Sequence, residues 1–75
     1  MIRMIVTYDA QLYLNDPIDY DEMIEKVSDK RCESSGMGFG QREMSFNFQH
    51  RDEAETARNR IQILNINGLS VIIFE

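Results

Sequence analysis

The stretch Glu33–Gln49, ESSGMGFGQREMSFNFQ, decides the fold that this sequence predicts. In its second half, Met44, Phe46 and Phe48 alternate with polar residues, which is typical of a strand with one buried face. Its first half carries glycine at every second position from residue 36 to residue 40 and leads directly into that strand. We therefore predict a β-hairpin from Cys32 to Gln49.

A turn at Gly40–Arg42 would set the register of this hairpin. Gly38 then lies opposite Met44, and Gly36 lies opposite Phe46. The glycines face the same side as the aromatic residues, because paired residues of two strands share a face. Three residues would face away from that side: Ser35, Met37 and Phe39. The first strand of this hairpin is thus predicted to be an edge strand with an apolar outer surface, open to pairing with another chain.

Before the hairpin, Ile2–Tyr8 alternates with period two and predicts a strand. Ile5 makes the second face of this strand partly apolar, which favours a central position in the sheet. Asp9–Ile18 is interpreted as a connection of about ten residues, long by the usual loop lengths. It contains three bulky apolar residues: Leu12, Tyr13 and Leu14. The favoured interpretation is that they close the end of the core, and the alternative is an exposed contact surface.

A helix is predicted from Asp19 to about Arg31. Asp19 and Glu22 have the spacing of a capping box, with Ile18 and Met23 at the positions of a hydrophobic staple. Apolar residues at helical spacing form one stripe: Tyr20, Met23, Ile24 and Val27. The acidic residues lie outside it and predict a solvated surface: Asp21, Glu22 and Glu25.

A second helix is predicted from Asp52, with Glu55 as its capping-box partner. Its apolar face comprises Ala54, Ala57, Ile61 and Leu64. Ile63 falls on the opposite side, so that either the helix ends before it or it is exposed. Asn67-Gly68 is a stop signal, because Gly68 takes the left-handed conformation without steric cost. Leu69–Glu75 is predicted to be the last strand.

The order strand, helix, strand, strand, helix, strand predicts one α+β domain over residues 1–75. The expected architecture is the ferredoxin-like split βαβ fold, a four-stranded antiparallel sheet with two helices on one face. Its strand order, 4-1-3-2, puts the first and third strands in the centre. This fold hosts many functions and assigns none.

Composition and motifs exclude several classes of function. The net charge is −5, with 13 acidic against 8 basic residues, so the chain lacks the basic footprint of a nucleic-acid-binding protein. The glycines precede a strand and not a helix, which argues against a phosphate-binding loop. A single cysteine allows no intrachain disulfide, and no apolar run is long enough to span a membrane. We expect a cytoplasmic protein without a cofactor or metal.

One pairing in the predicted register bears on catalysis. Cys32 would lie opposite His50, and a thiolate–imidazole pair is a known nucleophilic device. No other residue pattern supports it, and a small buried cysteine beside a strand-end histidine is the more common arrangement. We therefore predict no catalytic residues and a non-enzymatic function.

The outward face of the sheet gives the leading hypothesis, a protein-interaction module that binds itself or a protein partner. The predicted interface comprises Ile5, Met37, Phe39, Ile72, Phe74, Leu12 and Tyr13. Two alternatives remain open. One is a small acidic inhibitor that covers a basic surface of another macromolecule through Asp21, Glu22 and Glu25. The other is a small-ligand-binding domain, or a tiny dimeric enzyme, with a cleft at the sheet face.

Overall fold

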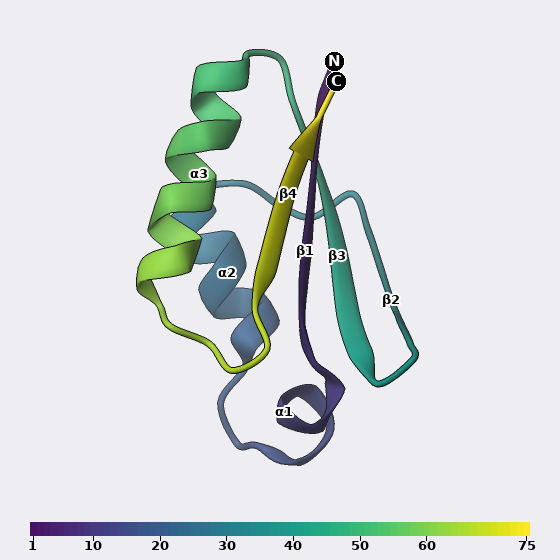
Figure 1. The fold of residues 1–75 in the computed structure, drawn as a ribbon. Coiled ribbons are helices and arrows are strands. Elements are labelled where there is room, and N and C mark those ends of the chain that lie inside the picture. The colour runs from purple at the N-terminus through teal and green to yellow at the C-terminus, as the bar shows by residue number, and fades with distance from the viewer.

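The computed structural model describes all residues from Met1 to Glu75 and shows an α+β fold with three helices and one four-stranded antiparallel sheet (Figure 1). The elements follow in this order: β1 (Ile2–Asp9), α1 (Ala10–Asn15), α2 (Tyr20–Ser28), β2 (Ser34–Gly38), β3 (Gln41–Phe48), α3 (Arg51–Ile63) and β4 (Ser70–Phe74).

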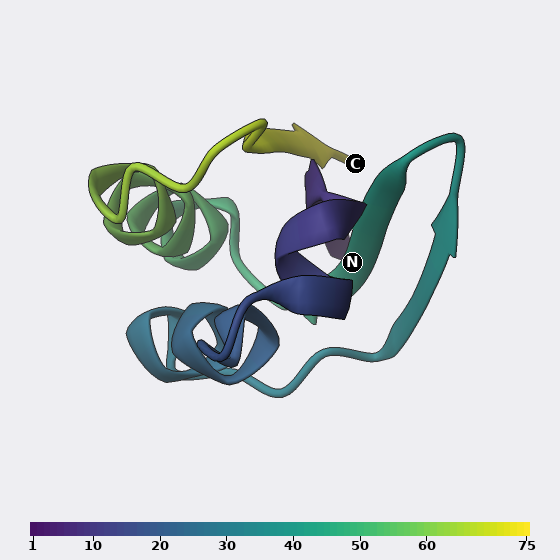
Figure 2. The ribbon, with the colours of Figure 1, turned by 90° about the horizontal axis from the view of Figure 1, so that it is seen from below.

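The sheet has the order β2-β3-β1-β4, which is β4-β1-β3-β2 when counted from the other edge. β1 and β3 therefore lie at the centre, as the sequence predicted, and β2 and β4 are the two edges. α2 and α3 lie side by side on one face of the sheet, whereas the other face carries no helix (Figure 2). No helix of this structure combines the length and the apolar character that crossing a membrane requires.

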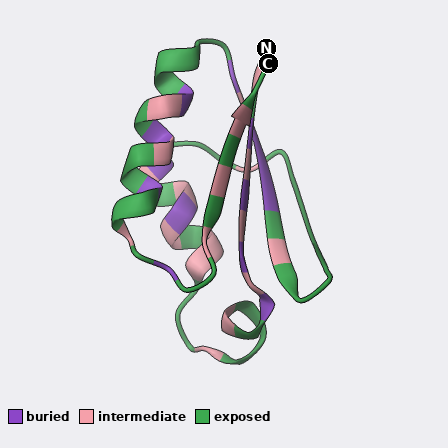
Figure 3. Ribbon diagram, in the orientation of Figure 1, coloured by how far each residue is buried: buried purple, intermediate pink, exposed green.

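The core lies between the sheet and the two helices, and it follows the periodicities of the sequence. Met4, Val6 and Tyr8 of β1 pair with Phe46, Met44 and Arg42 of β3. Figure 3 shows the buried residues along β1 and β3 and on the side of α3 that faces the sheet. The completely or nearly buried cluster comprises Met4, Val6, Tyr8, Ile24, Met44, Phe46, Phe48, Ala54, Ala57, Ile61 and Ile66.

α1 was missed by the sequence analysis, which treated the whole segment after β1 as a connection. Asp9 ends β1 and also caps α1, because its carboxylate accepts a hydrogen bond from the backbone N–H of Gln11 at 2.9 Å. Six residues are too few to show a helical period, so the sequence pattern does not predict this helix. It lies at the end of the sheet where β1 stops (Figure 1).

The two longer helices begin close to their predicted starts. α2 differs from the prediction in where it ends, and α3 differs in where it begins. Asp19 caps α2 as predicted and accepts from the N–H of Glu22 at 3.0 Å. The helix ends at Ser28 and not near Arg31, because Asp29 takes the left-handed conformation at a φ of 54°.

The N-cap of α3 lies two residues earlier than predicted. His50, and not Asp52, is its N-cap, without a side-chain hydrogen bond. Ile63 is the last helical residue and is 81% exposed, which was one of the two predicted outcomes. Gly68 has the positive φ that was predicted for it, 73°, but it lies in the turn before β4 and beyond the end of the helix.

Candidate functional site

The open face of the sheet carries one contiguous apolar patch, at β1 and β4. Ile5 is the direct cross-strand partner of Ile72, and Phe74 lies two residues further along β4, beside Arg3. Ile72 is 55% exposed and Phe74 is 43% exposed, whereas Ile5 is half-buried between its neighbours. We call these three side chains, Ile5, Ile72 and Phe74, the β4 patch. The sequence left open whether Ile72 and Phe74 or their neighbours share the open face with Ile5, and the strand register places Ile72 and Phe74 there.

The β4 patch continues onto an open strand edge. β4 pairs with β1 on one side only, and no strand follows it on the other side. Its five residues, SVIIF, include no charged side chain. Natural edge strands are usually protected by charges, proline or bulges. β4 has none of these, so its open backbone edge and the side chains of Ile72 and Phe74 are available for contact.

The other edge, β2, differs from the prediction in its register. Ser35 lies opposite Met44, and Met37 lies opposite Arg42. Ser35 and Met37 therefore point to the side of the sheet that carries the helices, and the prediction that they face away was wrong. Gly36 and Gly38, which alternate with them, lie on the open face. All five residues of β2 are exposed, since this strand extends past the helices (Figure 3).

The cause of this error is the position of the hairpin turn. The turn consists of Phe39 and Gly40, with φ angles of 54° and 77°, and not of Gly40–Arg42. Positive φ at both central residues is the signature of the two-residue turn that fits the twist of a hairpin. Moving the turn toward the N-terminus reverses which residues of β2 face the helices. Phe39 thus lies at the hairpin tip with its side chain fully in solvent, away from the β4 patch.

The sequence analysis missed a polar cluster. It lies between the sheet and α2, on the face that carries the helices. Arg42 of β3 donates through Nε and Nη2 to the carboxylate of Asp21 on α2, at 3.1 and 2.6 Å. The hydroxyl of Tyr8, a completely buried residue of β1, donates to the same carboxylate at 2.6 Å. The Arg42 guanidinium also lies 3.9 Å above the ring of Tyr13 on α1 and donates to Ser35 at 3.1 Å.

Burial and hydrogen bonding set the charge states in this cluster. Burial first, and then the hydrogen bond and charge of Asp21, raise the pKa of Tyr8 well above its usual range. The hydrogen bonds to Asp21 raise the pKa of Arg42. Arg42 is thus a fixed cation and Tyr8 a neutral donor. The hydrogen bonds from the Tyr8 hydroxyl and from Nε and Nη2 of Arg42 all go to groups of the same chain, and the Arg42 guanidinium stacks on Tyr13, so this cluster joins α1, α2 and the sheet.

The segment Leu12–Leu14 divides between the two interpretations. Leu12 packs against the core, as the favoured interpretation held. Tyr13 is 42% exposed and holds the Arg42 guanidinium, while Leu14 is 58% exposed. Only Leu12 closes the core, and an interface role for Tyr13 stays a prediction.

Two of the three residues predicted to form an acidic surface, Asp21 and Glu25, instead make hydrogen bonds within the chain. Asp21 faces the sheet and binds Arg42, with a side chain only 18% exposed. Glu25 accepts a hydrogen bond from the backbone N–H of Cys32 at 2.9 Å. Glu22 alone is exposed. The prediction that Asp21 lies on the solvated side of its helix was wrong, because the buried face of α2 is centred on Ile24 and Ser28 and extends to Asp21.

The structure does not bring Cys32 and His50 together as a pair. The register of the hairpin places Ser34 opposite Ser45, so that Cys32 precedes β2 and His50 follows β3 at the start of α3. Burial, and next the neighbouring carboxylate of Glu25, raise the pKa of the Cys32 thiol. A thiol with a raised pKa is a poor nucleophile at neutral pH.

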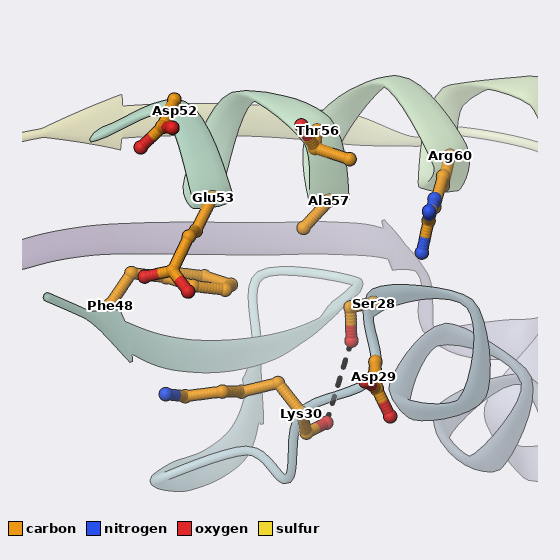
Figure 4. Close-up of a pocket in the computed structure, with 9 residues that line it drawn as sticks. All are labelled: Ser28, Asp29, Lys30, Phe48, Asp52, Glu53, Thr56, Ala57 and Arg60. Atoms are coloured by element: carbon orange, nitrogen blue, oxygen red, sulfur yellow. Dashed lines mark hydrogen bonds between the residues drawn. The ribbon is translucent and has the colours of Figure 1, made fainter. Parts of the chain in front are cut away.

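A cleft of about 340 Å³, lined in part by charged side chains, lies between α3 and the end of α2. In Figure 4, Asp52, Thr56 and Arg60 project from α3, and Lys30 lies across from them. The Lys30 ammonium lies 5.1 Å from the centre of the Phe48 ring. The Ser28 hydroxyl donates to backbone carbonyl oxygens and has no basic side chain as its partner. Both acidic and basic side chains line this cleft, and no three metal-binding side chains of the chain come together.

Comparisons with protein-family models, with curated proteins and with solved structures give no match to this chain.

Proposed function

We propose that this chain is a non-enzymatic protein-interaction module whose contact surface is the β4 patch together with the open edge of β4. The observation that carries the proposal is that exposed isoleucine and phenylalanine side chains lie on an uncharged strand edge. A monomeric protein rarely leaves such an edge and such side chains without a partner. We further propose that the fold is ferredoxin-like with α1 as an addition, which the strand order supports, and that the protein acts in the cytoplasm.

The small size of the core supports this proposal. Only 14 of the 75 residues are buried, so the chain has few apolar contacts of its own, and association is one way in which small domains gain more. The alternative of an acidic inhibitor receives less support, because Asp21 and Glu25 make internal hydrogen bonds.

The test is affinity capture with a tagged chain, from an extract of the source cell that also contains an untagged copy of the chain. The variant Ile72→Ser shortens the central side chain of the β4 patch. The control, Ile63→Ser, removes an equally large exposed side chain from the end of α3, on a different element. We expect the wild-type chain and the control to retain the same protein, whether the untagged copy or another protein, and Ile72→Ser to lose it.

The outcome that would refute the proposal is equal capture by all three chains, or capture of no protein by any of them. Circular dichroism of each purified variant ensures that a loss of binding does not reflect a loss of folding. Both substitutions affect exposed positions, for which stability changes are usually within about 0.5 kcal/mol.

A further inference from the structure

We propose that the partner is a second copy of this chain, and that the two copies pair through antiparallel β4 strands to form one continuous eight-stranded sheet. This inference rests on the proposed function and adds the identity and the geometry of the partner. An open strand edge presents a row of backbone N–H and C=O groups, and another extended strand satisfies such a row.

The sequence of β4 complements itself about its central residue. When Ile72 lies on a twofold axis, it faces Ile72 of the second copy, and Val71 faces Ile73 of the second copy. Ser70 then faces Phe74 of the second copy, so that all ten residues of the two strands are paired and none is charged. A shift of two residues in one direction brings Glu75 opposite Val71. A shift in the other direction brings Gly68, which has a positive φ, opposite Phe74.

The same register joins the two β4 patches. Ile5 and Ile72 are direct cross-strand partners within one copy. Across the axis they form a single row of four isoleucine side chains on the open face, in the order Ile5, Ile72, Ile72, Ile5. Direct partners on neighbouring antiparallel strands lie about 4.5–5.5 Å apart, close enough for their side chains to exclude water from one another.

Charge does not oppose this contact locally. The charged residue next to the strand, Glu75, already lies 3.6 Å from Arg51 of α3 in the same copy. The net charge of −5 acts between the two copies as a whole and is screened by salt. Dimerisation should therefore strengthen as the salt concentration rises, which is opposite to the behaviour of a complex held by ion pairs.

The other edge is a poorer site for a second copy. β2 carries glycine at positions 36 and 38, where no atom lies within 4 Å of an added Cβ, so that pairing there buries little apolar surface. Pairing of β2 with β4 of another copy would leave one free edge of each kind and would continue without closing. Pairing of β4 with itself closes at two copies.

The size of the contact predicts a weak dimer. A standard interface buries about 800 Å² on each partner, and the whole surface of the chain is 4908 Å². Two strands of five residues with their side chains cover less than the standard area, so we expect a dissociation constant on the order of 10–100 µM.

Sedimentation velocity over a concentration series tests the assembly. We expect the wild-type protein to change from monomer to dimer between about 1 and 500 µM, and the dimer to be favoured when NaCl is raised from about 0.05 to 0.5 M. Ile72→Lys places two like charges on the axis and should weaken dimerisation at least about tenfold, whereas Ile63→Lys should not. A chain that is monomeric throughout, or a dimer that salt dissociates, overturns the proposal.

Disulfide cross-linking tests the register. In a Cys32→Ala background, Ile72→Cys should form a linked dimer under mild oxidation, since directly paired Cα atoms lie within the range of about 4.4–6.8 Å that a disulfide spans. Ser70→Cys is the matched control on the same face and should not link, because Phe74 of the second copy lies opposite it. Equal linking of both variants, or of neither, overturns the register.

The two proposals can fail separately. If the purified chain remains monomeric but captures another protein in a manner that Ile72→Ser abolishes, the dimer is wrong and the interaction function stands. If neither association depends on Ile72, both are wrong.

Discussion

Replacement of Asp21 with alanine tests the polar cluster that joins the helices to the sheet. The substitution leaves the Arg42 guanidinium, whose side chain is 11% exposed, without its anion. It also leaves the hydroxyl of the buried Tyr8 without its acceptor. Removal of one partner from a buried ion pair costs about 3–5 kcal/mol. Because the side chains of the ion pair, Arg42 and Asp21, are 11% and 18% exposed and retain some contact with water, we expect the lower end of this range, about 3 kcal/mol.

This loss is large for so small a protein. A domain of this length has a free energy of unfolding of about 4–11 kcal/mol, so the Asp21→Ala variant should unfold at a clearly lower urea concentration. Glu55→Ala is the control, because Glu55 pairs with Arg51 on the surface, where the two side chains are 44% and 47% exposed. Its free energy of unfolding should change by less than about 0.5 kcal/mol.

A double-mutant cycle separates the ion pair from general disruption. Arg42→Met removes the cation, so that Asp21→Ala combined with Arg42→Met should lose less stability than the sum of the two single variants, by at least about 1.5 kcal/mol. Urea unfolding followed by circular dichroism measures all four proteins. The reasoning is refuted if Asp21→Ala is no less stable than Glu55→Ala, or if the two single losses simply add.

Three further predictions concern single positions. The pKa of Tyr8 is raised above its ordinary value of 10.0. The stability that its neutral hydroxyl contributes is therefore complete below pH 10. It declines above pH 10, where Tyr8 ionises in the unfolded chain but not in the folded one. Urea unfolding between about pH 8 and 11 should show this decline, and an unchanged slope in Tyr8→Phe would contradict it. Phe39→Asn places a residue that tolerates positive φ before Gly40, and should raise the free energy of unfolding by about 0.5–1 kcal/mol; a lower melting temperature would argue against strain at this turn. Gly68→Ala brings a Cβ to 3.2 Å from the backbone nitrogen of Asp9 at a φ of 73° and should cost about 1–2 kcal/mol, and a variant as stable as wild type would show that the turn before β4 adapts freely.

Parts of the β4 patch were predictable because they depend on period alone. Ile72 and Phe74 must point to the same face of any regular strand, and Ile5 must point to the face opposite to that of Met4 and Val6. The β4 patch needed one further condition, the register between β1 and β4, and the structure supplies it by placing Ile5 opposite Ile72. Two other predicted interface residues, Met37 and Phe39, do not belong to the patch, since they depended on the position of a turn.

The polar cluster could not be found from the sequence by the same means. Asp21 lies at the edge of the apolar stripe of α2. At 100° per residue around the helix axis, it lies only about 20° from Ser28, which is buried. A helix drawn from its apolar residues alone leaves Asp21 at the margin. Whether a carboxylate at the margin faces water or the sheet depends on a cation across the interface, and Arg42 is 21 residues away in the chain.

The sequence by itself determined the hairpin Glu33–Gln49 as a hairpin, the buried face of β3 and the central place of β1, because alternation over several residues leaves only one side for the core. The tertiary structure decided the turn at Phe39–Gly40 and therefore the side to which Met37 points. A shift of the turn that is small along the chain reverses every side chain of β2, and the glycines on this strand have no side chain whose burial would select one register. The strand that the sequence specified least is thus the one whose orientation only the folded chain could fix.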